Sequence, residues 1–282
     1  MQTHTKALYG LVATACLWSM GGLFIKIVPW HPLAIAGLRS LIACLVLLVL
    51  RDKQPFSFSS GVLLGGLANA GTMLFFVSAT KLTTAANAIL LQYTAPIFVA
   101  IFSFWFLRER IRTLDWLTIG VVFCGLCLFF LDKLNTDGML GNLLAILSGV
   151  CFGWQALFLR KYKDAATVDM LVVGNFMTML VGIPYLLHAP FTAASLGIVS
   201  FLGIFQVGLP YFLYTFSIKH VPAIAAITIL MLEPILNPVW VFMFLGERPG
   251  FWAAAGSVIV LGAITLRSLT LARQADNTRC SS

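Results

Sequence analysis

The feature that most constrains this chain is a long apolar stretch that occurs twice. Residues 81–110 read KLTTAANAILLQYTAPIFVAIFSFWFLRER, and residues 219–248 read KHVPAIAAITILMLEPILNPVWVFMFLGER. The copies align without a gap, and a lone Lys, a central Pro and a terminal Glu-Arg coincide in both. Shared apolar composition would not readily align all three at once. We therefore predict an internal duplication, because self-similarity at a fixed offset indicates repeated structural units.

Composition places most of this chain in lipid. Of its 282 residues, 60% are hydrophobic and only 10% are charged, whereas soluble domains carry roughly 25% charged residues. The polar side chains are therefore too few to cover a water-facing surface. The net charge of +8 is explained by Lys and Arg in loops. No basic stripe lies on a polar face, so we expect a lipid bilayer and no nucleic acid among the partners.

The six cysteines do not indicate metal, redox or disulfide chemistry. Five of them lie in apolar runs, where Cys behaves as a small hydrophobe. Cys124 and Cys127 have the spacing of a metal pair, but no His or carboxylate lies beside them. We expect packing there, and we expect no metal site and no cofactor.

Segments long enough to cross a bilayer, about 20 apolar residues each, occur ten times. Polar loops, among them RDKQP at 51–55, separate them. We predict an all-α membrane protein with ten transmembrane helices in two five-helix repeats, residues 5–133 and 138–271, and a disordered cytoplasmic tail at 272–282. The ten predicted spans cover residues 7–28, 32–50, 58–79, 83–107, 114–131, 138–159, 167–187, 193–217, 222–245 and 250–271.

The distribution of Lys and Arg predicts the orientation of the spans. With the N-terminus inside, thirteen of these residues fall on the inner side and four on the outer side, and Arg39 lies within a span. This bias predicts that both chain ends are cytoplasmic. Because each repeat has an odd number of spans, the second copy enters the membrane from the opposite side. Such an inverted repeat is the architecture of many secondary transporters that work by alternating access.

The prolines of the duplicated stretch predict helix breaks. Pro96 and Pro234 lie near the middle of the fourth and ninth spans, and Pro238 follows one turn later. Proline has no amide hydrogen, so the carbonyls of Gln92 and Leu230 lose their helical partners. In lipid, such a break persists only where protein or a wet cavity receives the freed group. A kink that serves packing is the alternative to our interpretation, which is a site at the membrane midplane.

Glu233 is a carboxyl in the middle of an apolar helix, where the first copy has Ala95. A charge there costs at least about 2.5–3.5 kcal/mol on insertion scales, so it must be paired, hydrated or protonated. One hypothesis is that Glu233 faces a central cavity and binds a substrate amine or carries a coupling proton. The alternative is a protonated carboxyl that bonds a freed backbone carbonyl.

Other polar and aromatic residues could complete a pocket for an amphipathic organic solute. We expect Arg39 and Lys26 instead to extend toward the outer membrane interface. With Glu233, the predicted substrate-binding residues are Trp18, Asn69, Gln92, Tyr93, Trp154, Gln206, Tyr211 and Asn237.

The motifs resemble those of the EamA-type transporters of the drug/metabolite transporter superfamily, over residues 5–271. WSMGGLFIK at 18–26, followed by Pro32 and Arg39, resembles the opening signature of the family. Trp18 and Lys26 match the first helix of that signature, and Pro96 and Pro234 match its broken helices. Glu109 and Glu247 match its helix ends.

The resemblance implies a central cavity between the first, third, fourth, sixth, eighth and ninth helices. It also implies alternating access, commonly for the export of amino acids or related metabolites. The second half departs from the family pattern, because CFGWQALFLRK at 151–161 does not repeat the opening signature.

Together these observations predict a secondary carrier for small organic metabolites in the inner (plasma) membrane, most simply an amino-acid exporter. Carriers of riboflavin, nucleosides or quaternary amines, a channel and a polytopic membrane enzyme are the alternatives. We expect no catalytic residues, since the acidic residues are scattered and no phosphate-binding GxxxxGK[ST] loop is present. Proton coupling is among the roles that we expect for Glu233.

Overall fold

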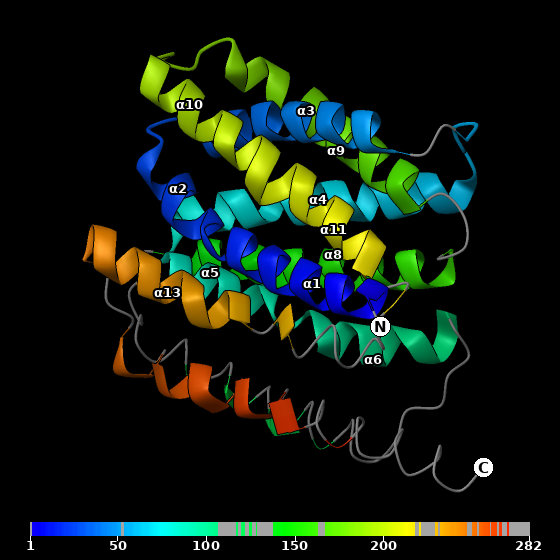
Figure 1. The fold of residues 1–282 in the computed structure, drawn as a ribbon. Helices are drawn as coiled ribbons and strands as arrows, with labels where there is room; N and C mark the ends of the chain where they lie inside the picture. Colours follow the sequence, from blue (N-terminus) through cyan, green and yellow to red (C-terminus); the bar gives the residue numbers. More distant parts are fainter. Residues whose placement is uncertain are drawn as a thin grey trace, which may run out of the picture.

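The computed structural model describes most of both halves of the chain. Every element formed by the described residues is a helix (Figure 1). Most of the predicted fifth span and the tail at 272–282 lie outside the described residues. The described residues are 2–51, 54–106, 138–162, 167–217, 229–230, 232–246 and single positions or short pieces within 117–128, at 220 and within 250–270.

The helices of the first half follow the predicted spans, with two interruptions. The first span is interrupted at Met20, and the fourth is interrupted at Tyr93 and Thr94. The helices are α1 Gln2–Ser19, α2 Gly21–Ile27, α3 Pro32–Leu50, α4 Ser60–Leu82, α5 Ala85–Gln92 and α6 Ala95–Phe106.

The second half contains a continuous eighth span that changes its winding. Its middle section, η1, is a π-helix between two α-helical sections. The helices are α8 Met139–Lys161, α9 Thr167–Leu186, α10 Ala193–Phe201, η1 Leu202–Gly208, α11 Leu209–Ser217 and α13 Leu232–Leu245. Six described helices are long and apolar enough to cross a membrane, and the chain is a multi-pass membrane protein.

Several helix starts follow from local sequence. The side chains of Ser59, Thr84 and Thr192 each accept a hydrogen bond from a backbone N–H in the first turn of the helix that follows. Such capping satisfies amides that have no helical partner. At the start of α3 the ring of His31 does the same, and Pro32 occupies the first helical position, where it needs no N–H.

The contacts between helices have the pattern of a two-fold relation between the halves. Helix α4 packs on α8 and on α9, and the corresponding eighth span packs on α1 and on α3. Likewise α5 and α6 pack on α8, while α13 packs on α1. The pair α3–α9 joins corresponding helices, and the pair α5–α13 joins the corresponding fourth and ninth spans. Figure 1 shows α1 lying between α11 and α13.

The halves run in opposite directions through the bundle. The Lys26 ammonium, near the end of α2, donates to the carbonyl of Thr83, directly after α4. The hydroxyl of Thr83 donates to Asn142 Oδ1, near the start of α8 (2.8 Å). The first span of one half therefore ends where the first span of the other half begins. This is the geometry of an inverted repeat.

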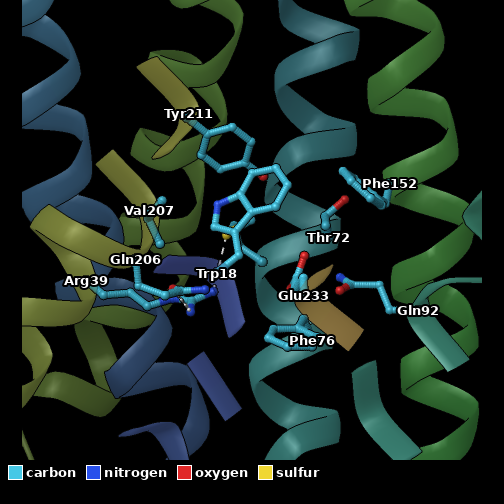
Figure 2. Close-up of a pocket in the computed structure, with 11 residues that line it drawn as sticks. Trp18, Arg39, Thr72, Phe76, Gln92, Phe152, Gln206, Val207, Tyr211 and Glu233 are labelled. Carbon is cyan, nitrogen blue, oxygen red and sulfur yellow. Dashed lines mark hydrogen bonds between the residues drawn. The ribbon is translucent and has the colours of Figure 1, made fainter. Parts of the chain in front are cut away.

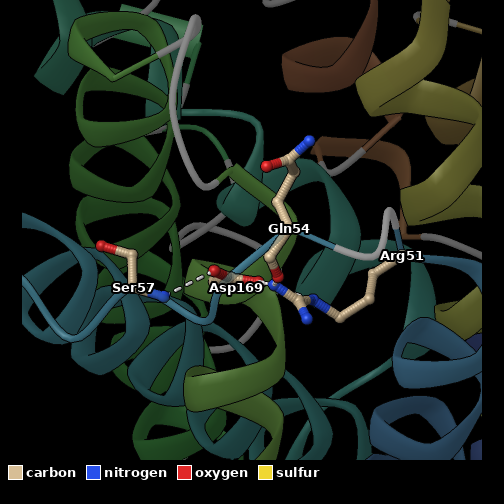
Figure 3. Close-up of polar contacts among 4 residues, drawn as sticks. All are labelled: Arg51, Gln54, Ser57 and Asp169. Carbon is tan, nitrogen blue, oxygen red and sulfur yellow. Dashed lines mark hydrogen bonds and ion pairs between the residues drawn. The ribbon is translucent and has the colours of Figure 1, made fainter.

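At the opposite end of the bundle an ion pair joins the two halves. Arg51, directly after α3, pairs with Asp169 in the first turn of α9 at 2.9 Å (Figure 3). Asp169 also accepts from the backbone N–H of Ser57, and Arg51 also donates to the carbonyl of Gln54. A carboxylate in the first turn of a helix is favoured by the helix dipole.

Helix α8 approaches α5 and α6 closely because it presents small residues at every fourth position. Gly141, Ala145, Gly149 and Gly153 recur at this spacing, which places them on one helix face. A Cβ atom on Gly149 would lie 2.9 Å from the carbonyl oxygen of Gln92, where α5 ends. Small residues of this kind let the backbones of membrane helices meet.

Candidate functional site

The fourth span is interrupted between α5 and α6, and the side chain of Thr94 stabilises the turn. The hydroxyl of Thr94 donates to the carbonyl of Leu91 (2.7 Å), and the backbone N–H of Thr94 donates to the same carbonyl (3.2 Å). Pro96 is the second residue of α6, a position at which proline costs no helical hydrogen bond. The interruption therefore precedes the proline rather than following it.

In the second copy, Pro234 is the third residue of α13. Because Pro234 has no N–H, the carbonyl of Leu230, four residues earlier, needs another donor. The hydroxyl of Tyr93 lies 3.1 Å from that carbonyl. A residue at the interruption of the first copy thus serves the backbone of the second copy.

Pro238 does not interrupt the helix, contrary to expectation. Helix α13 continues through it to Leu245. Proline in this position removes a single N–H toward the carbonyl of Pro234, and its fixed φ is compatible with a helix. A helix of 14 residues retains its other hydrogen bonds.

Glu233 shares the hydroxyl of Tyr93 with the Leu230 carbonyl. Its Oε2 atom lies 2.8 Å from the Tyr93 oxygen, and the residue is 7% exposed. A tyrosine hydroxyl has one proton to donate. An ionised Glu233 therefore competes with Leu230 for that proton, whereas a protonated Glu233 can donate to Tyr93 and leave its proton for Leu230.

A small cavity lies where the two halves meet, and Glu233 lines it (Figure 2). Its volume is about 40 Å³, room for roughly three water molecules at ~10–15 Å³ each. The lining comes from each of the six helices that the family resemblance implies and also from α3. The lining residues are Trp18, Arg39, Thr72, Met73, Phe76, Gln92, Phe152, Gln206, Val207, Tyr211 and Glu233.

Five of the nine predicted binding residues line this cavity, and aromatic rings form one wall of it. The ring of Trp18 lies 5.4 Å from that of Tyr211 and 6.5 Å from that of Phe152, both edge-on. Gln92 donates to the hydroxyl of Ser148 (2.8 Å), which fixes its amide. The five residues are Trp18, Gln92, Gln206, Tyr211 and Glu233.

The other four predicted residues lie outside the lining. Tyr93 does not line the cavity but donates a hydrogen bond to Glu233, which does. Trp154 stacks on Phe102 at 4.6 Å, between α8 and α6. Asn69 and Asn237 are fully buried, and their amide atoms have no hydrogen-bond partner among the described residues.

Arg39 lies in the cavity wall, and the expectation that it extends to the membrane interface is wrong. Its side chain is completely buried. Its Nη1 atom donates to Gln206 Oε1 (3.1 Å) and its Nη2 atom to Met73 Sδ (3.2 Å). Gln206 on η1 and Met73 on α4 thus hold it inside the bundle. Lys26, by contrast, is half-buried and donates to a backbone carbonyl at a helix end.

The π-helical section places Gln206 against Arg39. Pro210 has no N–H for the carbonyl of Gln206, so an ordinary helical bond cannot form there. The N–H of Leu209 bonds instead to the carbonyl of Ile204, five residues earlier. Gly21 lies so close to Gln206 that an added Cβ would be 2.7 Å from its Nε2. In the sequence, the signal for this π-helical section is Pro210, which lies four residues after the polar Gln206.

The remaining lining residues were not predicted, because Thr72, Met73, Phe76, Phe152 and Val207 resemble ordinary packing residues in sequence. Among the residues that the structure describes, no group of three His, Cys, Asp or Glu side chains could hold a metal ion. The polar groups of the cavity lining are one guanidinium, one carboxyl, two amides, two hydroxyls and a thioether, and they lie beside aromatic rings.

A family model and several curated proteins match this chain. The model described as "EamA-like transporter family" matches twice, at residues 5–131 and 139–269. The uncharacterized transporter YdfC of Bacillus subtilis is 29% identical over 81% of this chain and 77% of its own length.

Two further relatives have names that state an activity. The threonine/homoserine exporter RhtA of Escherichia coli is 27% identical over 77% of this chain and 70% of its own length. The pseudopaline exporter CntI of Pseudomonas aeruginosa is 26% identical, over 82% of this chain and 84% of its own length.

The fold also matches a solved structure. A crystal structure superposes with a TM-score of 0.69 at 18% sequence identity and covers 95% of this chain and 98% of its own. At that identity the match supports the arrangement of helices alone.

Proposed function

Because the chain belongs to the EamA-like transporter family, we propose that it is a secondary carrier that exports small zwitterionic metabolites such as amino acids. The observation that carries this proposal is the cavity between the halves, which places Glu233 beside Trp18 and Tyr211. A carboxyl beside aromatic rings suits an organic amine. The names of the exporters RhtA and CntI favour export of this class of solute.

We propose that transport proceeds by alternating access. The cavity of about 40 Å³ is too small for an amino acid, so a solute can enter only if the halves move apart. The contacts repeat when the halves are exchanged, and each half could therefore open toward one side of the membrane. The ion pair of Arg51 with Asp169 joins the halves at one end, and opening at that end would separate it.

Two roles for Glu233 follow from its hydrogen bond to Tyr93. In the first, its carboxylate binds the solute's ammonium group. In the second, it carries a coupling proton, and protonation returns the Tyr93 proton to the Leu230 carbonyl. The second role would link the charge of the cavity to the hydrogen bonding of the Leu230 carbonyl. Both roles require a carboxyl at this position.

The location and limits of the repeats are part of the proposal. We place the carrier in the inner (plasma) membrane with both chain ends in the cytoplasm, as the distribution of Lys and Arg predicts. We assign the repeats to residues 5–133 and 138–271. Reporter fusions at each terminus test this orientation, and reporters on opposite sides of the membrane would contradict it.

Counterflow in proteoliposomes tests the function. Vesicles are loaded with unlabelled solute, and uptake of the labelled solute is measured for the amino acids, nucleosides and quaternary amines in turn. Saturable counterflow of amino acids is the expected result. Linear flux without counterflow would instead indicate a channel, and activity restricted to nucleosides or quaternary amines would contradict the proposed substrate class. An imposed pH gradient in the same vesicles measures proton coupling.

A further inference from the structure

Arg39 is an arginine buried in the membrane region, and no carboxylate of the described part of the chain pairs with it. Its side chain is 0% exposed and lines the same cavity as Glu233. Among the described residues its guanidinium forms no ion pair; its bonds go to Gln206 and Met73. A charged side chain at this depth is costly unless it is paired or hydrated. Its retention inside the bundle therefore requires an explanation.

The hydrogen bonds of Arg39 leave part of the guanidinium available. An arginine has five N–H donors in a planar fork. Two nitrogens donate to Gln206 Oε1 and Met73 Sδ, and the buried Nε has no partner among the described residues. A thioether is a weak acceptor, so Met73 satisfies its donor poorly. The guanidinium is thus held in place, and its remaining N–H groups are available to bind an anion.

The two charged groups of the cavity lie on different elements of opposite halves. Arg39 comes from α3 and Glu233 from α13, and Figure 2 shows both side chains directed into the space between the lining residues. Glu233 takes its hydrogen bond from Tyr93 rather than from Arg39. A solute carrying both a carboxylate and an ammonium group could bind Arg39 with the first and Glu233 with the second.

We propose that Arg39 binds the carboxylate of the transported solute, through its free guanidinium donors, while Glu233 faces the solute's amine. Guanidinium and carboxylate match as a fork that forms two parallel hydrogen bonds. Gln206 and Met73 orient the fork. This inference rests on the proposed function and adds to it the residue that recognises the solute's carboxylate.

The test compares each transported amino acid with its methyl ester, which keeps the amine and lacks the carboxylate. Counterflow by the full-length protein is measured with the twenty labelled L-amino acids. For each acid that is transported, the concentrations of free acid and ester that halve the counterflow are compared. The wild type should prefer the acid at least about tenfold, as expected for the loss of a charge-assisted bond.

Three variants locate this preference. Arg39→Gln should bring the acid-to-ester ratio close to one, and Arg39→Lys, which keeps the charge but not the fork, should give an intermediate ratio. The control is Arg51→Gln, which removes an arginine that pairs with Asp169 outside the cavity; its ratio should equal that of the wild type. Thermal unfolding of each purified variant identifies those that fold.

The outcomes of this test distinguish a failure of the inference about Arg39 from a failure of the proposed function. Absence of counterflow for every amino acid would overturn the proposed function and the inference with it. Transport with equal preference for acid and ester in the wild type would overturn the inference alone, even if Arg39→Gln did not fold. A double Arg39→Gln, Glu233→Gln variant that regained the wild-type ratio would show that Arg39 only balances the charge of Glu233, which also overturns the inference.

Discussion

The two copies of the duplicated stretch stabilise the backbone before their repeated proline in different ways. In the first copy, Thr94 bonds to Leu91 three residues earlier, and Gly149 of α8 lies against the chain. In the second copy, the carbonyl of Leu230 depends on Tyr93, a residue of the first copy. The first copy is thus stabilised by its own Thr94 and by packing on α8, whereas the Leu230 carbonyl of the second copy takes its donor from the other half.

The copies also differ at the residue before the repeated proline. Ala95 is buried, and its carbonyl lies beside Gly153 of α8. Glu233 occupies the matching position in the second copy and lines the cavity. Duplication supplies the same backbone twice, while the substitution at this position gives a carboxyl to the second copy alone. We therefore expect substitutions in the first copy to change mainly stability, and loss of the Glu233 carboxyl in the second copy to change transport.

The largest effect is expected for Glu233→Gln. The amide keeps the size of the carboxyl and can still accept from Tyr93, so the fold should persist while the charge is lost. We expect counterflow of amino acids to fall more than about tenfold, the loss of one charge-assisted interaction. The measurement is initial counterflow rate, with Glu233→Asp as the variant that keeps a carboxyl. Wild-type rates with an unchanged pH dependence would show that the second copy is no more functional than the first.

The sequence predicted the architecture because lipid leaves few alternatives. Backbone groups in a bilayer must bond within helices, so apolar length alone locates spans such as 32–50 and 193–217, which the structure reproduces. The duplication indicated the inverted repeat, and the proline at matching positions drew attention to the fourth and ninth spans.

The composition of the cavity was less predictable from the sequence. Glu233 could be found because a carboxyl in an apolar run is conspicuous. Arg39 was misjudged because sequence position does not show whether a partner exists nearby; Gln206 is brought to it from 167 residues away by the π-helical section. Residues such as Thr72 and Phe152 carry no signal, since their role depends on which helices face each other.

The next largest effect is expected for Gly149→Val, which tests the packing that closes the first interruption. A Cβ at this position would lie 2.6 Å from Thr94 Oγ1 and 2.9 Å from the carbonyl oxygen of Gln92. We expect the free energy of unfolding to fall by about 1–3 kcal/mol, the usual cost of overpacking. Thermal unfolding in detergent measures it, with Gly197→Val as control, since an added Cβ there meets nothing within 4 Å. Equal unfolding temperatures would show that α8 does not hold the first interruption.

Tyr93→Phe tests the contact between the copies, because it removes the hydrogen-bond donor that the first copy provides to the second. The ring remains, but the Leu230 carbonyl and Glu233 lose their shared hydroxyl. We expect a loss of roughly 1–2 kcal/mol in the free energy of unfolding, together with a changed pH dependence of counterflow. The exposed Tyr9→Phe is the control. A stable variant with wild-type pH dependence would mean that the backbone at Leu230 does not depend on the first copy.

The smallest effect is expected for Pro238→Ala, and it separates the two prolines of the second copy. Because α13 runs unbroken through Pro238, alanine adds one N–H that can bond the carbonyl of Pro234 and changes little else. We expect the free energy of unfolding to change by less than about 1 kcal/mol. Pro234→Ala is the matched variant, since its new N–H can reach the Leu230 carbonyl and displace Tyr93 from it. Counterflow should therefore change its pH dependence in Pro234→Ala and keep it in Pro238→Ala. If both variants behaved alike, the proline next to Glu233 would have no special role, and the shared Tyr93 hydroxyl would not couple the carboxyl to the helix.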